Sequence, residues 1–190
     1  MHVLKKKYFF IIETINDINL NKFKKLDKFN IIYRNKKYNE NIDKLKKFVN
    51  LCKSKRINFF VANNSLLAKE IGAQGLYISS YNKKIYHHYL RNNKFKIIGS
   101  AHNLKEFLLK KRQGCSEILF SRIFQTRYKN KEGNLGIIKF NLLMQNYTFK
   151  LVPLGGINKN TLNKMYNVNS NSLALSGQIK EDNNFNKLFY

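Results

Sequence analysis

The chain alternates between short apolar runs and longer amphipathic segments. The apolar runs are rich in β-branched and aromatic residues and lack polar alternation, which is typical of parallel strands buried on both faces. The segments between them place apolar residues at helical spacing, as at Leu45, Val49 and Cys52. The predicted strands are the eight segments 8–12, 29–33, 58–61, 76–78, 95–98, 117–120, 149–152 and 173–175.

Eight strand–helix repeats predict a compact α/β fold, a (β/α)8 TIM barrel in which residues 1–190 form a single domain. Alternating strands and helices favour a parallel sheet covered by helices, and eight repeats favour closure into a barrel. An open doubly wound sheet remains the alternative. The chain has 190 residues, slightly fewer than the roughly 200 at the low end of the range for this fold. We therefore expect only short helices after the first strand and at 183–190.

The sequence is strongly basic, with a formal net charge of +25 from 36 Lys and Arg against 11 Asp and Glu. Such a charge is typical of proteins that bind nucleic acid or an anionic membrane surface. However, the basic residues are spread along the whole chain, and no zinc-finger spacing, ribonucleoprotein motif or basic zipper is present. An AT-rich coding sequence also favours this Lys- and Asn-rich usage. We therefore do not expect nucleic acid as the partner, although a basic RNA-associated protein stays an alternative.

The cysteines and the N-terminal segment bear on the compartment. Cys52 and Cys115 are too few and too irregularly spaced for a disulfide framework or a structural zinc site, so we expect buried thiols in a reducing compartment. The first apolar run ends at Ile12 and is followed by Glu13, which makes it too short for a signal peptide or a membrane-spanning helix. We expect a cytoplasmic protein without a membrane partner.

Two glycine-containing loops follow the last two predicted strands. Gly155 and Gly156 follow the seventh strand, and Ser176 and Gly177 end the eighth. Barrels of this kind often hold phosphate at these two positions, where backbone N–H groups and a following helix N-terminus approach the anion. The loops therefore predict a phosphate site, with simple tight turns as the alternative.

Two other loops bring positive charge to the same end of the predicted barrel. Arg34 and Lys36 follow the second strand, and the sixth strand opens into 121–129, which contains Arg122 and Lys129. Arg can bind phosphate oxygens through two hydrogen bonds and Lys acts as a point charge, so together they can hold a diphosphate. Solvated basic loops in a Lys-rich protein are the alternative.

The order and spacing of these loops resemble thiamine phosphate synthase and its relative, the thiazole tautomerase. The resemblance covers almost the whole chain. Arg34 to Lys36 resembles the family's Arg-x-Lys, although Ile32 replaces the Gln that precedes it, and Gly72 to Ile78 is similar to Gly-Ala-Asp-Gly-Val-His-Leu. Further similar segments are Ile98 to Asn103, Gly114 to Ile118, Ile123 to Lys129 and Leu154 to Asn158.

The resemblance implies a reaction and roles for particular residues. Family members join a hydroxymethylpyrimidine diphosphate to a thiazole phosphate and release diphosphate by ionisation at the pyrimidine's methylene carbon. The partners are then phosphorylated small molecules. The residues implied as catalytic are Arg34, Lys36, Ser100 and Lys129, and those implied as substrate-binding are Thr126, Gly155, Gly156, Ser176 and Gly177.

The chain departs from the family where magnesium is coordinated. Two family aspartates correspond to Asn63 and Asn82, whose amide oxygens can ligate Mg²⁺ but supply no charge. We therefore expect magnesium to be attracted only through the substrate diphosphate. Three functions stay open: a diverged synthase, a tautomerase acting on thiazole phosphate without metal, and a non-catalytic barrel that binds a phosphorylated ligand.

The histidines are not predicted to belong to the site. His102 follows the fifth strand, but no carboxylate lies beside it in the sequence, so we expect it to have a hydrogen-bonded structural role. His87 and His88 fall in the predicted helix after the fourth strand with no other metal ligand nearby, and we expect them to be surface or packing residues.

Overall fold

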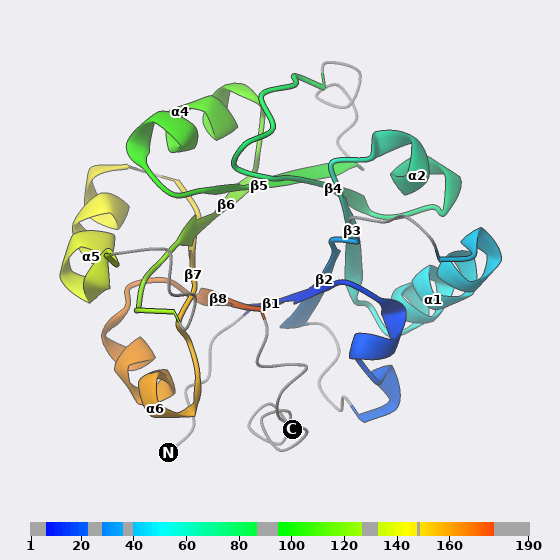
Figure 1. Cartoon of the computed structure of the whole chain (residues 1–190), viewed down its shortest axis with the longest axis horizontal. Helices are drawn as coiled ribbons and strands as arrows, with labels where there is room; N and C mark the ends of the chain where they lie inside the picture. Colours follow the sequence, from blue (N-terminus) through cyan, green and yellow to red (C-terminus); the bar gives the residue numbers. More distant parts are fainter. Residues whose placement is uncertain are drawn as a thin grey trace.

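The computed structural model describes residues 7–22, 28–35, 40–86, 95–126, 133–147 and 149–176. Its strands form a closed parallel barrel in which each strand pairs with the next along the chain and β8 pairs with β1 (Figure 1). The predicted barrel is confirmed, and the open-sheet alternative is excluded. The strands are β1 (Lys7–Ile12), β2 (Phe29–Tyr33), β3 (Asn58–Ala62), β4 (Gly75–Ile78), β5 (Lys96–Ala101), β6 (Glu117–Ser121), β7 (Leu151–Leu154) and β8 (Ser172–Ser176).

The helices lie outside the ring of strands (Figure 1). They are α1 (Ile42–Ser54), α2 (Ser65–Glu70), α4 (Leu104–Arg112), α5 (Gly136–Asn146) and α6 (Lys159–Leu162), and α6 continues into the 3₁₀ turn η4 (Asn163–Asn167). None of the helices in the described ranges is long and apolar enough to cross a membrane. The predicted helix at 183–190 and the two histidines at 87 and 88 lie outside the described residues.

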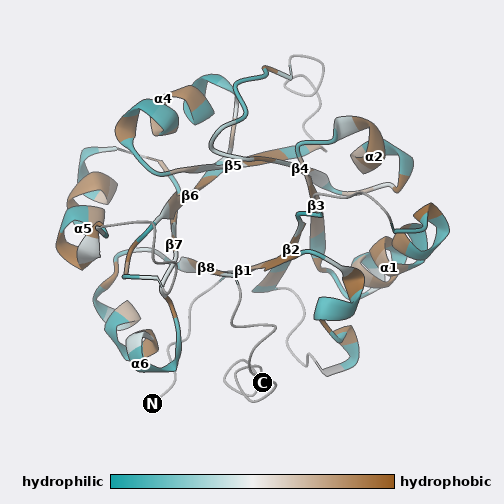
Figure 2. Ribbon diagram, viewed as in Figure 1, coloured by the Kyte–Doolittle hydropathy of each residue, from teal (hydrophilic) through white to brown (hydrophobic). Residues whose placement is uncertain are grey.

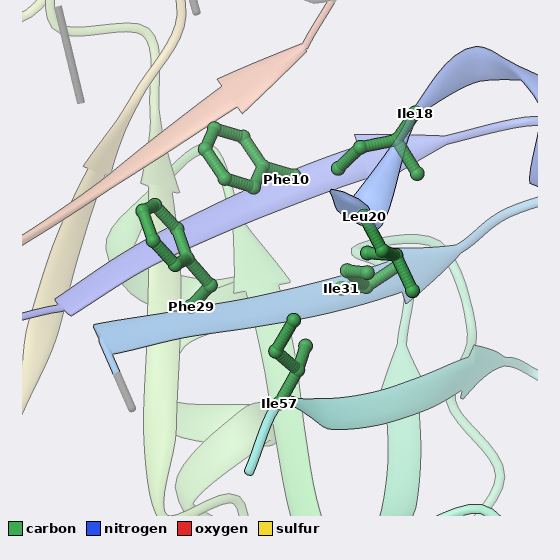
Figure 3. Close-up of a pocket in the computed structure, with 6 residues that line it drawn as sticks. All are labelled: Phe10, Ile18, Leu20, Phe29, Ile31 and Ile57. Atoms are coloured by element: carbon green, nitrogen blue, oxygen red, sulfur yellow. The ribbon is translucent and has the colours of Figure 1, made fainter. Parts of the chain in front are cut away.

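Where a short helix was expected after β1, the described residues 13–22 form two 3₁₀ turns, η1 (Ile15–Asp17) and η2 (Leu20–Lys22). Ile18 and Leu20, from this segment, pack against Phe10, Phe29, Ile31 and Ile57 on the outer face of the barrel (Figure 3). These side chains pack so tightly that no space for a water molecule remains between them. Two turns thus cover a face that a full helix covers elsewhere in the barrel, which explains how so short a chain completes the fold.

Successive strand residues alternate between two apolar layers. Figure 2 colours the strands mostly as hydrophobic, whereas the helices carry both kinds of residue. Residues such as Phe10, Ile31 and Phe59 face the outer layer of helices and 3₁₀ turns. The barrel interior is filled by Phe9, Ile11, Ile32, Phe60, Ala62, Tyr77, Ile98, Leu119, Val152 and Ala174. Because both faces are buried, the strands read as unbroken apolar runs in the sequence.

The two cysteines are buried and unbonded, as predicted. Cys52 lies on the inner face of α1 and Cys115 precedes β6. Burial raises the pKa of each thiol to about 12. The burial agrees with the expected packing role, while the reducing compartment inferred from these residues stays a prediction.

Polar side chains close the amino end of the barrel. Lys7 in β1 donates to Glu117 in β6 at 2.9 Å, although these two strands are not neighbours in the barrel. Nearby, Asn58 donates to the side-chain oxygen of Asn30 at 2.9 Å. These bonds tie the interior ends of separate strands together. The opposite, carboxyl end is the mouth at which (β/α)8 barrels place their binding loops.

Candidate functional site at the carboxyl end of the barrel

Parallel pairing brings the carboxyl ends of all eight strands to this mouth. Arg34 follows β2, Ser100 lies near the end of β5, Thr126 follows β6, Gly155 and Gly156 follow β7, and Ser176 ends β8. The described part of the predicted site therefore lies at one end of the barrel. The remaining predicted residues, Lys36, Lys129 and Gly177, lie outside the described residues.

Arg34 and Ser100 converge on a tyrosine that sequence reasoning did not select. Tyr77 in β4 points into the barrel, is 2% exposed, and shares a side-chain hydrogen bond with Ser100. Burial raises the pKa of the Tyr77 phenol, and the Ser100 hydrogen bond and the charge of Arg34 oppose that rise. Tyr77 therefore stays protonated near neutral pH. The top of the interior carries a hydroxyl pair with a cation within electrostatic reach.

A network of amides and hydroxyls occupies the mouth beside β3 and β4. Asn63 Oδ1 accepts from the backbone N–H of Ser79 at 2.9 Å and from Asn82 Nδ2 at 3.0 Å. Asn63 Nδ2 donates to Ser79 Oγ at 2.8 Å and to the Tyr81 hydroxyl at 3.1 Å. Asn63 has a φ of 57°, a left-handed conformation that Asn tolerates better than most residues. Its amide therefore makes four bonds that fix its orientation.

This network does not fit a resident magnesium ion. Asn82 Oδ1 accepts from the backbone N–H of Lys84 at 2.9 Å, so the side-chain oxygens of both asparagines are already engaged. Mg²⁺ in proteins is usually held by at least one carboxylate. Across the described ranges, no group of three or more His, Cys, Asp or Glu residues is placed to hold a metal ion. A cation at this position would have to break bonds that the protein now makes to itself.

The loops after β6 and β7 are bound closely to each other. Phe124 N–H donates to the carbonyl of Gly155 at 3.1 Å. Gly155 and Gly156 have φ values of 93° and 71°, and a Cβ on Gly156 would lie 2.5 Å from the Gln125 carbonyl oxygen. Close approach of the two loops thus accounts for the glycines on structural grounds alone. Within the described part of the chain, however, the N–H groups of Gly156 and Ile157 donate to no protein acceptor.

The short helix after this loop is capped by one of the protein's own side chains. Helix α6 has only four residues, so its dipole is small. The side chain of Asn158 caps it by accepting from the N–H groups of Asn160 at 2.9 Å and Thr161 at 3.1 Å. The N–H groups of Asn160 and Thr161 thus already have an acceptor within the protein, and the expectation that this helix N-terminus assists phosphate binding stays a prediction.

Arg122, which was expected only as one of the cations at the mouth, contacts both of these loops. Its Cγ lies 3.0 Å from the position that a Cβ would take on Gly155. Its Nη1 donates to Thr126 Oγ1 at 3.5 Å, the long limit of a hydrogen bond. The stem of Arg122 therefore lies against Gly155, while its guanidinium points to Thr126 in the loop after β6. The available sequence signal was an Arg directly after a predicted strand at the mouth.

His102 has the carboxylate partner that the sequence analysis did not find. Its Nδ1 lies 3.1 Å from Glu106 Oε2, which also accepts from the His102 backbone N–H at 2.7 Å. Glu106 is four residues further on, in the first turn of α4, and the helix start brings it back to His102. The expected hydrogen-bonded role agrees with this contact, but the reason given for it was wrong.

The fold is that of a (β/α)8 barrel with a polar mouth at the carboxyl ends of its strands. Comparison with known families is more specific: residues 26–179 match the thiamine monophosphate synthase family. The chain belongs to this family.

The curated relatives agree with this assignment. Thiamine-phosphate synthase of Prochlorococcus marinus is 29% identical over 142 residues, which cover 74% of this chain and 41% of the relative. Thiamine-phosphate synthase of Chlorobium phaeobacteroides is 29% identical over 131 residues, 68% of this chain and 64% of the relative. The matches thus span less than two thirds of each relative's length.

Solved structures support the fold. Thiamine phosphate pyrophosphorylase from Pyrococcus furiosus superposes with a TM-score of 0.75 at 17% identity and covers 98% of this chain and 93% of that chain. KGPDC from Streptococcus mutans gives a TM-score of 0.60 at 11% identity, with 97% and 94% covered. Identities this low show a shared architecture and no more.

Proposed function

We propose that this chain is a thiamine phosphate synthase-like transferase that joins hydroxymethylpyrimidine diphosphate to thiazole phosphate at the barrel mouth. Membership of the family over residues 26–179 supports the reaction class. The observation that carries the proposal is the polar group of Arg34, Tyr77 and Ser100 at the top of an otherwise apolar interior. Buried polar groups in an apolar barrel are typical of a ligand site.

The proposed reaction breaks one bond and forms one bond, and each change involves one electron pair. The bond between the pyrimidine's methylene carbon and the diphosphate oxygen breaks, and its electron pair leaves with the diphosphate. The thiazole nitrogen then supplies the pair for the new carbon–nitrogen bond. Little acid–base chemistry is required, so the protein's contribution is to orient two rings and stabilise the negative charge that develops on the leaving group.

Each group of residues has a role in this proposal. Arg34, with the predicted Lys36 and Lys129, neutralises the diphosphate, while Ser100 and Thr126 position the rings. The thiazole phosphate lies against the N–H groups of Gly156 and its neighbours, Ser176 and the predicted Gly177. Arg122 joins this second site because its side chain follows the glycine loop. Magnesium enters only with the diphosphate, since the asparagine network holds no place for it.

One observation favours a tautomerase as the second candidate. The hydrogen bond from Asn82 to Asn63 closes the position at which the resemblance places metal-binding carboxylates. A tautomerase acting on thiazole phosphate alone needs neither metal nor a diphosphate site. The asparagines therefore weigh towards this reaction, whereas the cations on the β2 and β6 loops weigh towards the synthase.

The purified chain should be given both substrates, and then each alone, with magnesium present and absent. Formation of thiamine phosphate together with released diphosphate supports the synthase. Isomerisation of thiazole phosphate alone, followed by NMR, supports the tautomerase. Binding of either ligand without turnover supports a non-catalytic barrel, and no binding of either overturns the proposal.

A variant tests the placement of the diphosphate. Arg34→Met should lower kcat/KM for the coupling reaction by at least 100-fold, because a charge-assisted contact to the leaving group is lost. Arg112→Met removes the same charge from the exposed end of α4 and serves as the control. Equal rates for the two variants would show that Arg34 does not contact the diphosphate.

A further inference from the structure

Helix α4 contains a lysine that is completely buried. Lys110 has 0% of its surface exposed, although lysine is among the residues least often buried. Its stem lies against β5, where a Cβ on Gly99 would come within 2.9 Å of Lys110 Cδ and 2.8 Å of Cys115 Sγ. The strand glycine therefore leaves the space that the long side chain occupies. A buried ammonium has to be compensated by hydrogen bonds.

The compensation comes mainly from the loop after β4. Lys110 Nζ donates to the backbone carbonyl of Asn82 at 2.8 Å and to Gln113 Oε1 at 2.8 Å. Gln113, also 0% exposed, donates from Nε2 to the carbonyl of Asn82 at 3.0 Å and to that of Lys84 at 2.8 Å. Two side chains one helical turn apart thus hold two carbonyls of one loop. We call Lys110 and Gln113 the α4 clamp.

The groups that face the ammonium do not form an ion pair with it. Cys115 and Glu106 act on it electrostatically, but no salt bridge joins Lys110 to a carboxylate in the described residues. Desolvation lowers the pKa of Lys110. An apolar side chain at this position would avoid this cost of burial. The hydrogen bonds that Lys110 and Gln113 make to the loop after β4 offset this cost.

We infer that Lys110 and Gln113 are positioning residues that fix the loop after β4 and, through it, the asparagine network at the mouth. The clamp holds the backbone of Asn82, and the side chain of the same residue donates to Asn63 Oδ1. Asn63 in turn orients Ser79 through two bonds. The path from the buried lysine to the mouth therefore consists of consecutive hydrogen bonds.

The inference rests on the proposed function for its effect on substrates, but its effect on the loop is independent. The network lies beside β3 and β4, whereas the glycine loops follow β7 and β8, across the barrel. Loosening the clamp should therefore weaken binding of pyrimidine diphosphate and leave thiazole phosphate unaffected. A general loss of packing would affect both.

Hydrogen exchange and steady-state kinetics on Lys110→Met test the clamp. Backbone amides of residues 79–86 should exchange at least 10-fold faster, while those of β5 and β6 keep their protection. KM for pyrimidine diphosphate should rise at least 5-fold, and KM for thiazole phosphate should change less than 2-fold. Lys105→Met, which removes an exposed lysine from the same helix, should change neither exchange nor KM.

A second variant keeps the test decisive where Lys110→Met fails to fold. Gln113→Glu retains an acceptor for the Lys110 ammonium but removes both hydrogen-bond donors to the loop. Amide hydrogen exchange of residues 79–86 should therefore become faster, although Lys110 keeps its partner at position 113. Unchanged exchange of residues 79–86 in both variants would overturn the clamp. If the wild-type chain turns over neither substrate, the proposed function fails, and the exchange data alone still decide the clamp.

Discussion

Asn82 donates a hydrogen bond from Nδ2 to Oδ1 of Asn63 at 3.0 Å, and this bond joins the neighbouring loops after β3 and β4 at one side of the mouth. Two carboxylates in these places would repel each other and attract a cation. Two amides instead bind each other directly. Asp at both positions, as the resemblance implies for the family, would need an ion, whereas the two Asn side chains satisfy each other without one.

This relationship predicts the response to magnesium. Isothermal titration of the unmodified chain should show no saturable Mg²⁺ binding at millimolar concentration. Asn63→Asp with Asn82→Asp should restore two charges and strengthen magnesium-dependent binding of pyrimidine diphosphate by about 10-fold or more, since Mg²⁺ prefers carboxylate ligands.

The control for this pair adds the same charge elsewhere. Asn41 and Asn103 cap the N-termini of α1 and α4, where Asp caps equally well, so Asn41→Asp with Asn103→Asp should not change magnesium binding. Tight metal binding by the unmodified chain, or an equal gain in the control, would show that the metal position has been misplaced.

The fold could be predicted from the sequence because each strand carries its own signal, and the errors lie at strand ends. The predicted segment 95–98 stops before Gly99, yet β5 continues to Ala101. Glycine is there because Cys115 and Lys110 pack against the strand at that point. The segment 149–152 stops before Pro153, although Pro153 lies in β7 and is the register partner of Phe120 in β6. Local composition does not show such contacts.

The site was less predictable because its relationships join distant residues. Loop position placed Arg34 and Gly156 at the mouth, and the family resemblance placed Ser100 there. By contrast, Tyr77 reads as one more aromatic strand residue, and Lys110 reads as one lysine among many on a basic helix. Only packing shows that Tyr77 faces inward beside Ser100 and that Lys110 is buried.

Arg122 should contribute to phosphate affinity. Arg122→Met is expected to weaken binding of thiazole phosphate or inorganic phosphate by about 10-fold, because the Arg122 stem lies against Gly155 and its guanidinium, which reaches Thr126 in the neighbouring loop, can supply a charge-assisted bond to the anion. Isothermal titration at two ionic strengths measures the change. Arg112→Met is the matched control, and a loss of the same size in both variants would mean that only the net charge matters.

Both cysteines should resist modification in the folded chain. Burial holds Cys52 and Cys115 as thiols, and the thiolate is the reactive form. A colorimetric thiol reagent at pH 8 should modify neither residue in buffer and both in denaturant. Rapid modification of either one in the native state would show that its segment opens readily.

The raised thiol pKa values also set the direction of an alkaline effect. Unfolded thiols ionise from pH 9.0, whereas the folded ones hold their protons to about 12, so folding stability falls as the pH rises through this window. Each thiol contributes at most about 1.4 kcal/mol per pH unit. Cys52→Ala should flatten the pH dependence of the free energy of unfolding between pH 9.5 and 11. Lys110, whose pKa is lowered, changes the pH dependence of stability in the opposite direction. Because both the unmodified chain and Cys52→Ala contain Lys110, its contribution cancels when the two are compared.

The ion pair across the amino end of the barrel should affect stability without affecting substrates. The Lys7 side chain is 44% exposed and that of Glu117 only 12%, so the two partners are not equivalent. Lys7→Met leaves a largely buried carboxylate without its partner and should cost about 2 kcal/mol, whereas in Glu117→Gln the amide oxygen still accepts from Lys7 and the cost should be about 1 kcal/mol. Urea unfolding measures both costs, with Glu70→Gln on the exposed end of α2 as the control.

Since the Lys7–Glu117 pair lies at the end of the barrel opposite the mouth, KM for either substrate should stay within 2-fold of the unmodified chain. A reversed order of the two costs would mean that Glu117 is held by other groups, and a change in KM would mean that the two ends of the barrel are coupled.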